Sequence, residues 1–131
     1  AEKSLQDVYY LAAKIIDSKS KLNLTDPHAP KFTVNVSLDM ELNEIPPQFD
    51  LTDKKVLHAL NQEINKKLTG ELDDLIRRLQ SVQSDVVGFG EIYRSKVRGS
   101  NLTRDEWHEK YRKAEISCSV QVHLLRTGIL E

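Results

Sequence analysis

Residues 32–42 read FTVNVSLDMEL and alternate without interruption between apolar and polar side chains. A period of two is typical of a β-strand that has one buried face and one solvated face. Two prolines, Pro46 and Pro47, follow shortly afterwards, and proline cannot donate the backbone hydrogen bond that a continuing strand requires. The stretch therefore predicts a strand that ends before Pro46. Its buried face would carry Phe32, Val34, Val36, Leu38, Met40 and Leu42.

A second alternation near the C-terminus predicts another strand of the same kind, with polar side chains opposite its apolar ones. The apolar residues are Ile116, Cys118, Val120, Val122 and Leu124. Because its neighbours on that face are aliphatic, Cys118 is interpreted as a small buried apolar residue without chemistry. It is the single cysteine of the chain, so an internal disulfide is excluded.

The first part of the chain fits two patterns. Residues 1–16 match both helical spacing and strand alternation, so the pattern leaves the choice between strand and helix open. The stretch 14–24 has Ser18, Ser20, Leu22 and Leu24 on one parity and is followed by the turn-forming sequence DPHAP at 26–30. We therefore interpret 14–24 as a strand that forms a hairpin with residues 32–42.

The region between the two clear strands is predicted to be helical. Its apolar residues recur about every 3.6 positions from 57 to 93, which is the α-helical repeat. One helix over 53–97 would be about 68 Å long, whereas a compact chain of this size has a radius of gyration of roughly 14 Å. Ser81 to Ser84 and the glycines at 88 and 90 are the expected breaks. We expect two helices, 53–80 and 84–97, the first with Thr52 as its N-cap.

A short helix is expected to begin at Arg104, because Thr103 and Glu106 have the spacing of a capping box. Trp107 and Tyr111 lie four residues apart and share a face of this helix. The predicted fold class is α+β: an antiparallel sheet of at least three strands, with the long amphipathic helices and the Trp107 helix packed on one face.

Composition favours one folded domain over residues 1–131, because 39% of the 131 residues are hydrophobic and 30% are charged. The formal net charge is −1, which predicts no general attraction to nucleic acid. The longest apolar run, 8–13, is far shorter than the roughly 18–20 residues of a membrane-spanning helix.

Motifs for catalysis or for metal and cofactor binding are missing from the sequence. The four histidines occur singly, without the paired spacing of a local metal site. Gly88-Phe89-Gly90 lacks the third glycine and the Lys-Ser/Thr end of a phosphate loop. There is no G-x-S-x-G elbow to present a nucleophile. We therefore expect no enzymatic activity, no cofactor and no metal.

A local excess of positive charge surrounds the predicted loop near Gly99. Most basic segments are only solvated surface; the functional interpretation is a contact with phospholipid headgroups or an acidic partner. The residues of this basic patch are Arg94, Lys96, Arg98 and Arg104.

The sequence resembles the C-terminal region of the Ger(x)C spore germination proteins, the C subunits of nutrient germinant receptors. The likeness rests on DVVGFG at 85–90, on Trp107 about seventeen residues later, and on the closing alternating strand with Gly128. It also takes in SKSK at 18–21 and LNE at 42–44, and so covers nearly the whole chain. By this resemblance the signature or interaction residues are Asp85, Gly88, Phe89, Gly90, Trp107 and Glu44.

The same residues also have a structural interpretation. Gly88 and Gly90 would let a neighbouring element approach the second long helix closely. Phe89 would fill the space there, and Asp85 would cap a helix.

The resemblance implies a non-catalytic lipoprotein on the outer face of the inner spore membrane, working with the A and B receptor subunits. Its role would be assembly or signalling in nutrient-triggered germination. The chain shows no signal peptide, no lipidation cysteine and no preceding domains, so we expect it to be the C-terminal domain of a larger lipoprotein. Residues 97–102 lack an aromatic that many members would have. The alternative is a small-molecule domain that binds a nutrient in a pocket between sheet and helices.

Overall fold

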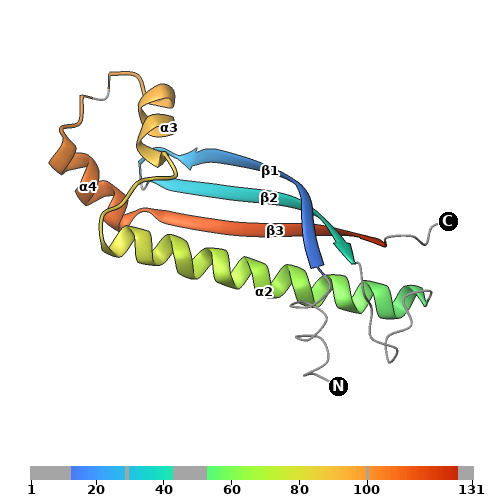
Figure 1. Cartoon of the computed structure of the whole chain (residues 1–131). Coiled ribbons are helices and arrows are strands. Elements are labelled where there is room, and N and C mark those ends of the chain that lie inside the picture. The colour runs from blue at the N-terminus through green and yellow to red at the C-terminus, as the bar shows by residue number, and fades with distance from the viewer. Residues whose placement is uncertain (1–12, 29, 43–52, 100, 127–131) are drawn as a thin grey trace. The chain divides into compact units, whose positions relative to one another are not determined.

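A computed structural model describes residues 13–28, 30–42, 53–99 and 101–126 of the chain (Figure 1). Glu44 and the proposed cap Thr52 lie outside these residues. Of the ambiguous segment 1–16, residues 1–12 also lie outside them, and residues 13–16 are part of a strand. The elements along the chain are β1 (Ala13–Asp26), β2 (Lys31–Leu42), α2 (Lys54–Ser81), α3 (Phe89–Lys96), α4 (Arg104–Lys113) and β3 (Glu115–Arg126).

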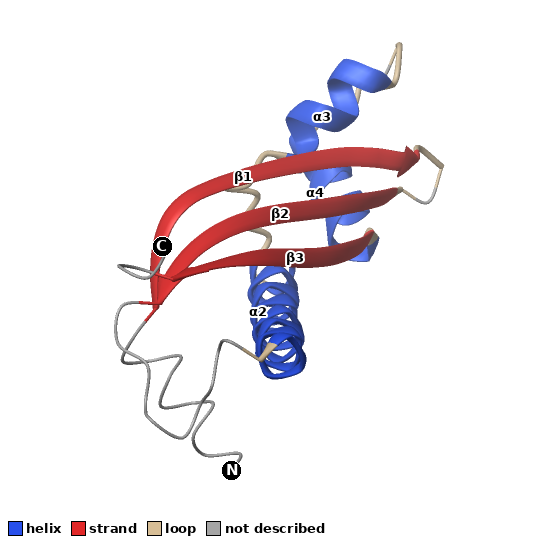
Figure 2. Ribbon diagram, turned by 90° about the vertical axis from the view of Figure 1, so that its right-hand side faces the viewer, coloured by secondary structure: helices blue, strands red, loops and turns tan. Residues whose placement is uncertain are grey.

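The three strands form one sheet in the order β1-β2-β3, with helices alongside it, and the fold is of the predicted α+β class (Figure 2). The predicted antiparallel arrangement is correct for β1 and β2 and wrong for β3, which runs parallel to β2 (Figure 1). Parallel neighbours need a long crossover. Helix α2 supplies it, because its 28 residues span about 42 Å, close to the roughly 40 Å of the 12-residue β2.

The hairpin between β1 and β2 is confirmed. At the turn the Asp26 carboxylate accepts a hydrogen bond from the backbone N–H of His28 at 2.9 Å. The Thr25 hydroxyl donates to the carbonyl of Lys31, at 3.2 Å, across the start of β2. An Asp that bonds the backbone two residues ahead is the usual reason for this residue type in a turn.

The predicted break after α2 is confirmed, but the second helix begins at Phe89 and not at residue 84. The backbone N–H of Ser84 donates to Leu79 O at 2.8 Å and that of Gln83 to Gln80 O at 3.1 Å. These two bonds form a Schellman motif, whose left-handed position is held here by Gln83 with φ of 57°. Glycine normally occupies that position, so the motif was not visible in the sequence.

Replacing Gln83 with glycine is expected to stabilise the fold by up to about 1 kcal/mol, because a left-handed conformation strains an L side chain and not glycine. Urea denaturation of both proteins would measure the difference. Gly70→Ala serves as the comparison variant, because it is a glycine exchange at an ordinary helical position. Gly70 lies in α2 with nothing within 4 Å of an added Cβ. A lower unfolding free energy for Gln83→Gly would mean that the Gln83 side chain contributes contacts larger than the strain.

The predicted start of α4 is confirmed by its capping box. The backbone N–H of Glu106 donates to the Thr103 hydroxyl at 3.1 Å, and that of Thr103 donates to the Glu106 carboxylate at 2.8 Å. The hydrogen bond that the Thr103 backbone donates to the carboxylate, followed by the interaction with the Thr103 side chain, lowers the pKa of Glu106. The short helix is therefore held in register, which orients Trp107 and Tyr111 toward the interior.

The chain divides into two compact units, each with its own buried side chains. The first unit comprises Ala1–Lys19, Val36–Leu68 and Val120–Glu131, and the second comprises Ser20–Asn35 and Thr69–Ser119. In the first unit the buried apolar residues are Met40, Leu60, Ile64, Val120 and Val122. In the second they are Phe32, Val34, Ile76, Phe89, Tyr93, Trp107, Tyr111 and Ala114.

The predicted faces of β2 and β3 are confirmed, since residues of the apolar parity are the more buried ones in both strands. Cys118 lies on the predicted face of β3 but is only half-buried, so the prediction of a buried residue is wrong in degree. Desolvation, followed by the nearby Asp73 carboxylate, raises the pKa of its thiol. The helices of the described ranges include none with the length and hydropathy that crossing a membrane requires.

Candidate functional site

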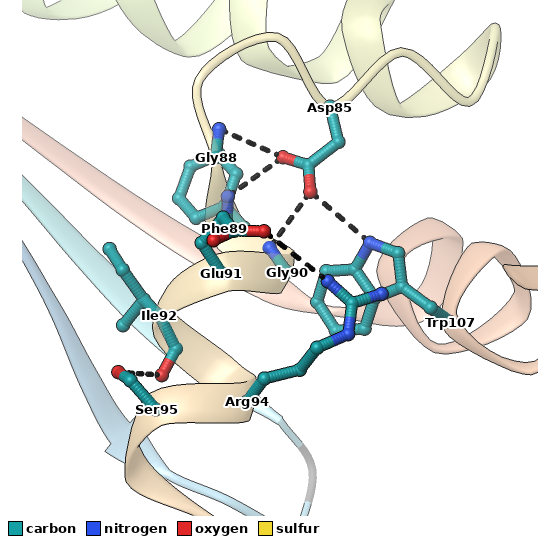
Figure 3. Close-up of polar contacts among 9 residues, drawn as sticks. All are labelled: Asp85, Gly88, Phe89, Gly90, Glu91, Ile92, Arg94, Ser95 and Trp107. Atoms are coloured by element: carbon teal, nitrogen blue, oxygen red, sulfur yellow. Dashed lines mark hydrogen bonds and ion pairs between the residues drawn. The ribbon is translucent and has the colours of Figure 1, made fainter. Parts of the chain in front are cut away.

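The carboxylate of Asp85 joins the loop after α2 to α3 and α4 (Figure 3). Its Oδ1 accepts hydrogen bonds from the backbone N–H groups of Gly88 at 3.2 Å and Phe89 at 2.8 Å. Its Oδ2 accepts from the backbone N–H of Gly90 at 2.8 Å and from the indole Nε1–H of Trp107 at 3.2 Å. We refer to Asp85, Gly88, Phe89, Gly90 and Trp107 as the Asp85 junction.

Asp85 caps α3 from outside the helix. The N-cap residue of α3 is Gly88, which has no side chain to accept the free N–H groups of the first turn. The Asp85 carboxylate takes that role, and its negative charge also complements the positive end of the helix dipole. The N-terminus of α3 is thus occupied by an anion of the chain itself.

An aromatic cluster packs behind the junction. Phe32 of β2 meets Phe89 at a ring-centroid distance of 5.0 Å and Trp107 at 6.5 Å, both edge to face. Trp107 stacks on Tyr111 at 5.9 Å and lies 5.5 Å from Tyr93. Such pairs contribute about 0.5–1.5 kcal/mol each beyond the area that they bury. The cluster attaches α3 and α4 to β2 within the second unit.

The two glycines of the junction have different roles. A Cβ on Gly90 would lie 2.9 Å from Trp107 Nε1 and 3.1 Å from Asp85 Oδ2, so Gly90 allows the predicted close approach. A Cβ on Gly88 would meet nothing within 4 Å, so the same prediction is wrong for Gly88. Gly88 is instead required by its backbone, since its φ is 97°.

Gly90→Ala is expected to lower the free energy of unfolding by about 1–3 kcal/mol, because the added methyl group overpacks the contact between Asp85 and Trp107. Chemical denaturation gives the value, and the near-UV circular dichroism of Trp107 would report its displacement. A neutral effect on both readouts would show that the junction accommodates the methyl group without displacing the indole, and would contradict the prediction.

Two further side chains, those of Tyr111 and Gln80, connect α4 to the end of α2 and the loop after it. The Tyr111 hydroxyl donates to the carbonyl of Ser84 at 2.7 Å. The Gln80 amide nitrogen donates to the carbonyls of Tyr111 and Ala114, at 2.9 and 3.0 Å. Carbonyls at a helix C-terminus lack partners within the helix, so Gln80 caps α4 from α2. Neither contact was predicted, because each joins residues far apart in the sequence.

Deprotonation of Tyr111 should make the free energy of unfolding depend on pH in the alkaline range. Burial, followed by the Asp85 carboxylate, raises the pKa of Tyr111 from 10.0 to about 12. As the pH rises, the unfolded chain therefore loses this proton before the folded chain does. The stabilisation that is complete below pH 10 is lost as the pH rises toward the pKa of the folded state. We expect a loss of about 1 kcal/mol between pH 9 and pH 11 from this group. Urea midpoints of wild type and Tyr111→Phe across that range would isolate it; parallel curves would contradict the prediction.

The structure brings together five of the six residues that the sequence singled out, and the sixth, Glu44, lies outside the described residues. The residues that the sequence missed are Gln80, Ser84 and Tyr111. For Tyr111 a signal existed, since it shares a helix face with Trp107. Whether the junction contacts a partner stays a prediction.

The basic patch lies on exposed surface of the second unit. Arg94 and Lys96 belong to α3, Arg98 follows it, and Arg104 begins α4; all four side chains are exposed. Arg94 lies 3.8 Å from the Glu91 carboxylate. Among the described residues no group of histidine, cysteine and acidic side chains is arranged to hold a metal ion.

Comparison with known proteins matches this chain to spore germination proteins. The family described as Spore germination B3/GerAC like, C-terminal, matches residues 2–128. Spore germination protein KC of Bacillus subtilis (strain 168) is 28% identical over 102 residues, which are 76% of this chain and 25% of that protein. Spore germination protein GerQC of Bacillus cereus is 23% identical over 114 residues, covering 87% of this chain and 31% of that protein.

A solved structure shares the fold. The crystal structure of the GerBC protein superposes with a TM-score of 0.72 at 21% identity, covering 86% of this chain and 36% of that chain. At this identity the likeness concerns the fold alone. The chain thus spans between a quarter and about a third of the length of the proteins that it matches.

Proposed function

Because this chain belongs to the spore germination B3/GerAC-like C-terminal family, we propose that it is a non-catalytic domain of a germinant receptor C subunit. The observation that carries the proposal is the family match over residues 2–128. The domain would support assembly of the receptor or its signalling when nutrients trigger germination. It would do so through protein contacts and not through chemistry on a substrate.

The same proposal covers the parent protein, its location and its partners. The parent protein would be a lipoprotein on the outer face of the inner spore membrane, and this chain would be its C-terminal domain. Its partners would be the A and B subunits of the receptor. The basic patch is the proposed contact with headgroups or an acidic partner segment, because its four exposed cations follow one another along α3 and into α4.

The arrangement of the second unit supports a scaffold more than a ligand pocket. Phe32, Phe89 and Tyr111 are at most 1% exposed and fill the space between β2 and the two short helices with side chains. Buried pockets for small molecules need several hundred Å³ of free volume. The place left for the nutrient-binding alternative is a groove of about 330 Å³ between α2 and β3, lined in part by Asp73, Arg77 and Gln80. Titration with amino acids and sugars followed by amide shifts would detect binding there.

The proposed function is tested in spores. We expect that deletion of the gene slows the optical-density loss of spores in nutrients and leaves unchanged the response to calcium dipicolinate, which bypasses nutrient receptors. Complementation with the full-length gene should restore the nutrient response. A gene deletion that affects neither response, in a strain without other C subunit genes, would contradict the proposal.

A further inference from the structure

Helix α2 is attached to its neighbours at two separate places. In the first unit Ile64 is buried, and the amide oxygen of Asn65 accepts a hydrogen bond from the backbone N–H of Val122 in β3, at 2.7 Å. In the second unit Ile76 is buried, and Gln80 donates to two carbonyls at the end of α4. We call the stretches 60–65 and 76–80, which hold these contacts, the two anchors of α2.

The helix between the anchors carries no buried side chain. From Ile64 to Ile76 the axis rises by about 18 Å, and none of residues 65–75 is buried. The three leucines at 68, 72 and 75 continue the apolar repeat of the helix. Those at 68 and 72 are nevertheless only half-buried, and Leu75 is 44% exposed. A segment with few buried apolar contacts is one that opens locally while the rest of a protein stays folded.

Gly70 lies at the centre of this unburied stretch, where neither packing nor backbone conformation requires a glycine. A Cβ added to Gly70 would meet nothing within 4 Å. The glycines of the described ranges with a positive φ are Gly88 and Gly99, and Gly70 is not one of them. In a helix interior glycine favours the opened state over alanine by about fivefold. Gly70 therefore weakens α2 at the point where the helix has the least support.

We propose that Gly70 is a hinge, at which α2 bends and its backbone hydrogen bonds open while both anchors hold. Sharp bends in helices have few causes, and glycine is one of them. In an α-helix the N–H groups of residues 70–74 donate to the carbonyls of residues 66–70, so these hydrogen bonds cross the hinge. Their opening changes the direction of one half of α2 relative to the other half, and it breaks the contacts of neither anchor.

The role of this hinge in signalling rests on the proposed function. In a receptor subunit that signals, a change at one anchor reaches the other through α2, and Gly70 sets how readily the helix changes its shape. A substitution that stiffens the hinge then raises the stability of the fold and lowers its function. That combination is the known conflict between stability and a function that needs flexibility.

Hydrogen exchange of the full-length protein, followed by mass spectrometry, tests the hinge. We expect residues 66–75 to exchange several-fold faster than the two anchors. Low urea concentrations should hardly change that rate, because a local opening exposes little surface. Gly70→Ala should slow the exchange of 66–75 by about fivefold. If this stretch exchanges no faster than the anchors, or accelerates with urea as steeply as they do, α2 opens only by global unfolding and the proposal is overturned.

Moving the glycine along the helix provides a matched variant. Lys66 is exposed and lies one turn before Gly70, within the unburied stretch. The double variant Gly70→Ala, Lys66→Gly should exchange as fast as wild type over 66–75. Lys66→Ala is the control for loss of the lysine and should not change the rate, because both residues favour a helix. A double variant that exchanges as slowly as Gly70→Ala would overturn the proposal.

The signalling role is tested in spores that carry the full-length gene. Gly70→Ala should slow the nutrient-driven loss of optical density several-fold and leave the response to calcium dipicolinate unchanged. The double variant should restore the nutrient response, and Lys66→Ala should not affect it. A normal nutrient response with Gly70→Ala would overturn the signalling role. Because hydrogen exchange does not depend on germination, failure of the gene-deletion test and failure of the hinge are distinguishable.

Discussion

Trp107→Ala is expected to lower the free energy of unfolding by about 3–5 kcal/mol, the usual cost of truncating a large core aromatic. The side chain is 4% exposed and packs against Phe32, Tyr93 and Tyr111. Its indole N–H also bonds the Asp85 carboxylate. The truncation leaves a cavity, removes one ring neighbour from each of these three aromatic side chains and leaves the carboxylate with one donor fewer. Urea denaturation followed by far-UV circular dichroism would measure the loss.

Trp107→Phe is the matched control, because it keeps a ring in the cluster and removes the indole N–H. We expect it to cost clearly less than the alanine variant. A loss below about 1 kcal/mol for Trp107→Ala would contradict a core role. If partner binding were lost as well, Trp107 would belong to an interface.

Asp85→Ala is the second change with a large expected effect. It should lower the free energy of unfolding by roughly 2–4 kcal/mol. It removes the acceptor of three backbone N–H groups and of one indole N–H, and a hydrogen bond to a charged group is worth about 1.5–3 kcal/mol. The loss stays below the sum of these bonds, because the groups are only partly buried and water replaces some of them. Thermal and urea unfolding would both report it.

Asp85→Asn separates the two halves of the junction. The amide oxygen of asparagine can still accept from Gly88 and Phe89, while its NH₂ group would face the donors of Gly90 and Trp107. We expect Asp85→Asn to lower the free energy of unfolding by less than Asp85→Ala does. A double-mutant cycle of Asp85→Ala with Trp107→Phe should give a coupling energy of about 0.5–3 kcal/mol. Additive losses would show that the 3.2 Å contact contributes nothing to stability.

Local patterns account for the parts of the fold that were predicted correctly. The alternation in β2 and β3 is visible because a pleated strand turns successive side chains to opposite faces. The Thr103–Glu106 capping box was visible because both partners lie within one helical turn. The start of α3 was missed, because the loop 84–88 depends on hydrogen bonds from Asp85 and Tyr111 that its own residue types do not reveal.

The amino-acid sequence by itself determined the strands, the helix boundaries at Ser81 and Arg104, and the candidate residues Asp85 and Trp107. Each depends on spacing or residue type within a few positions. Only the tertiary structure decided that β3 runs parallel to β2, that Asp85 bonds an indole 22 positions away, and that Val82 and Val86 stay exposed. These depend on which elements meet in space, and a periodic pattern specifies an apolar face without specifying its partner.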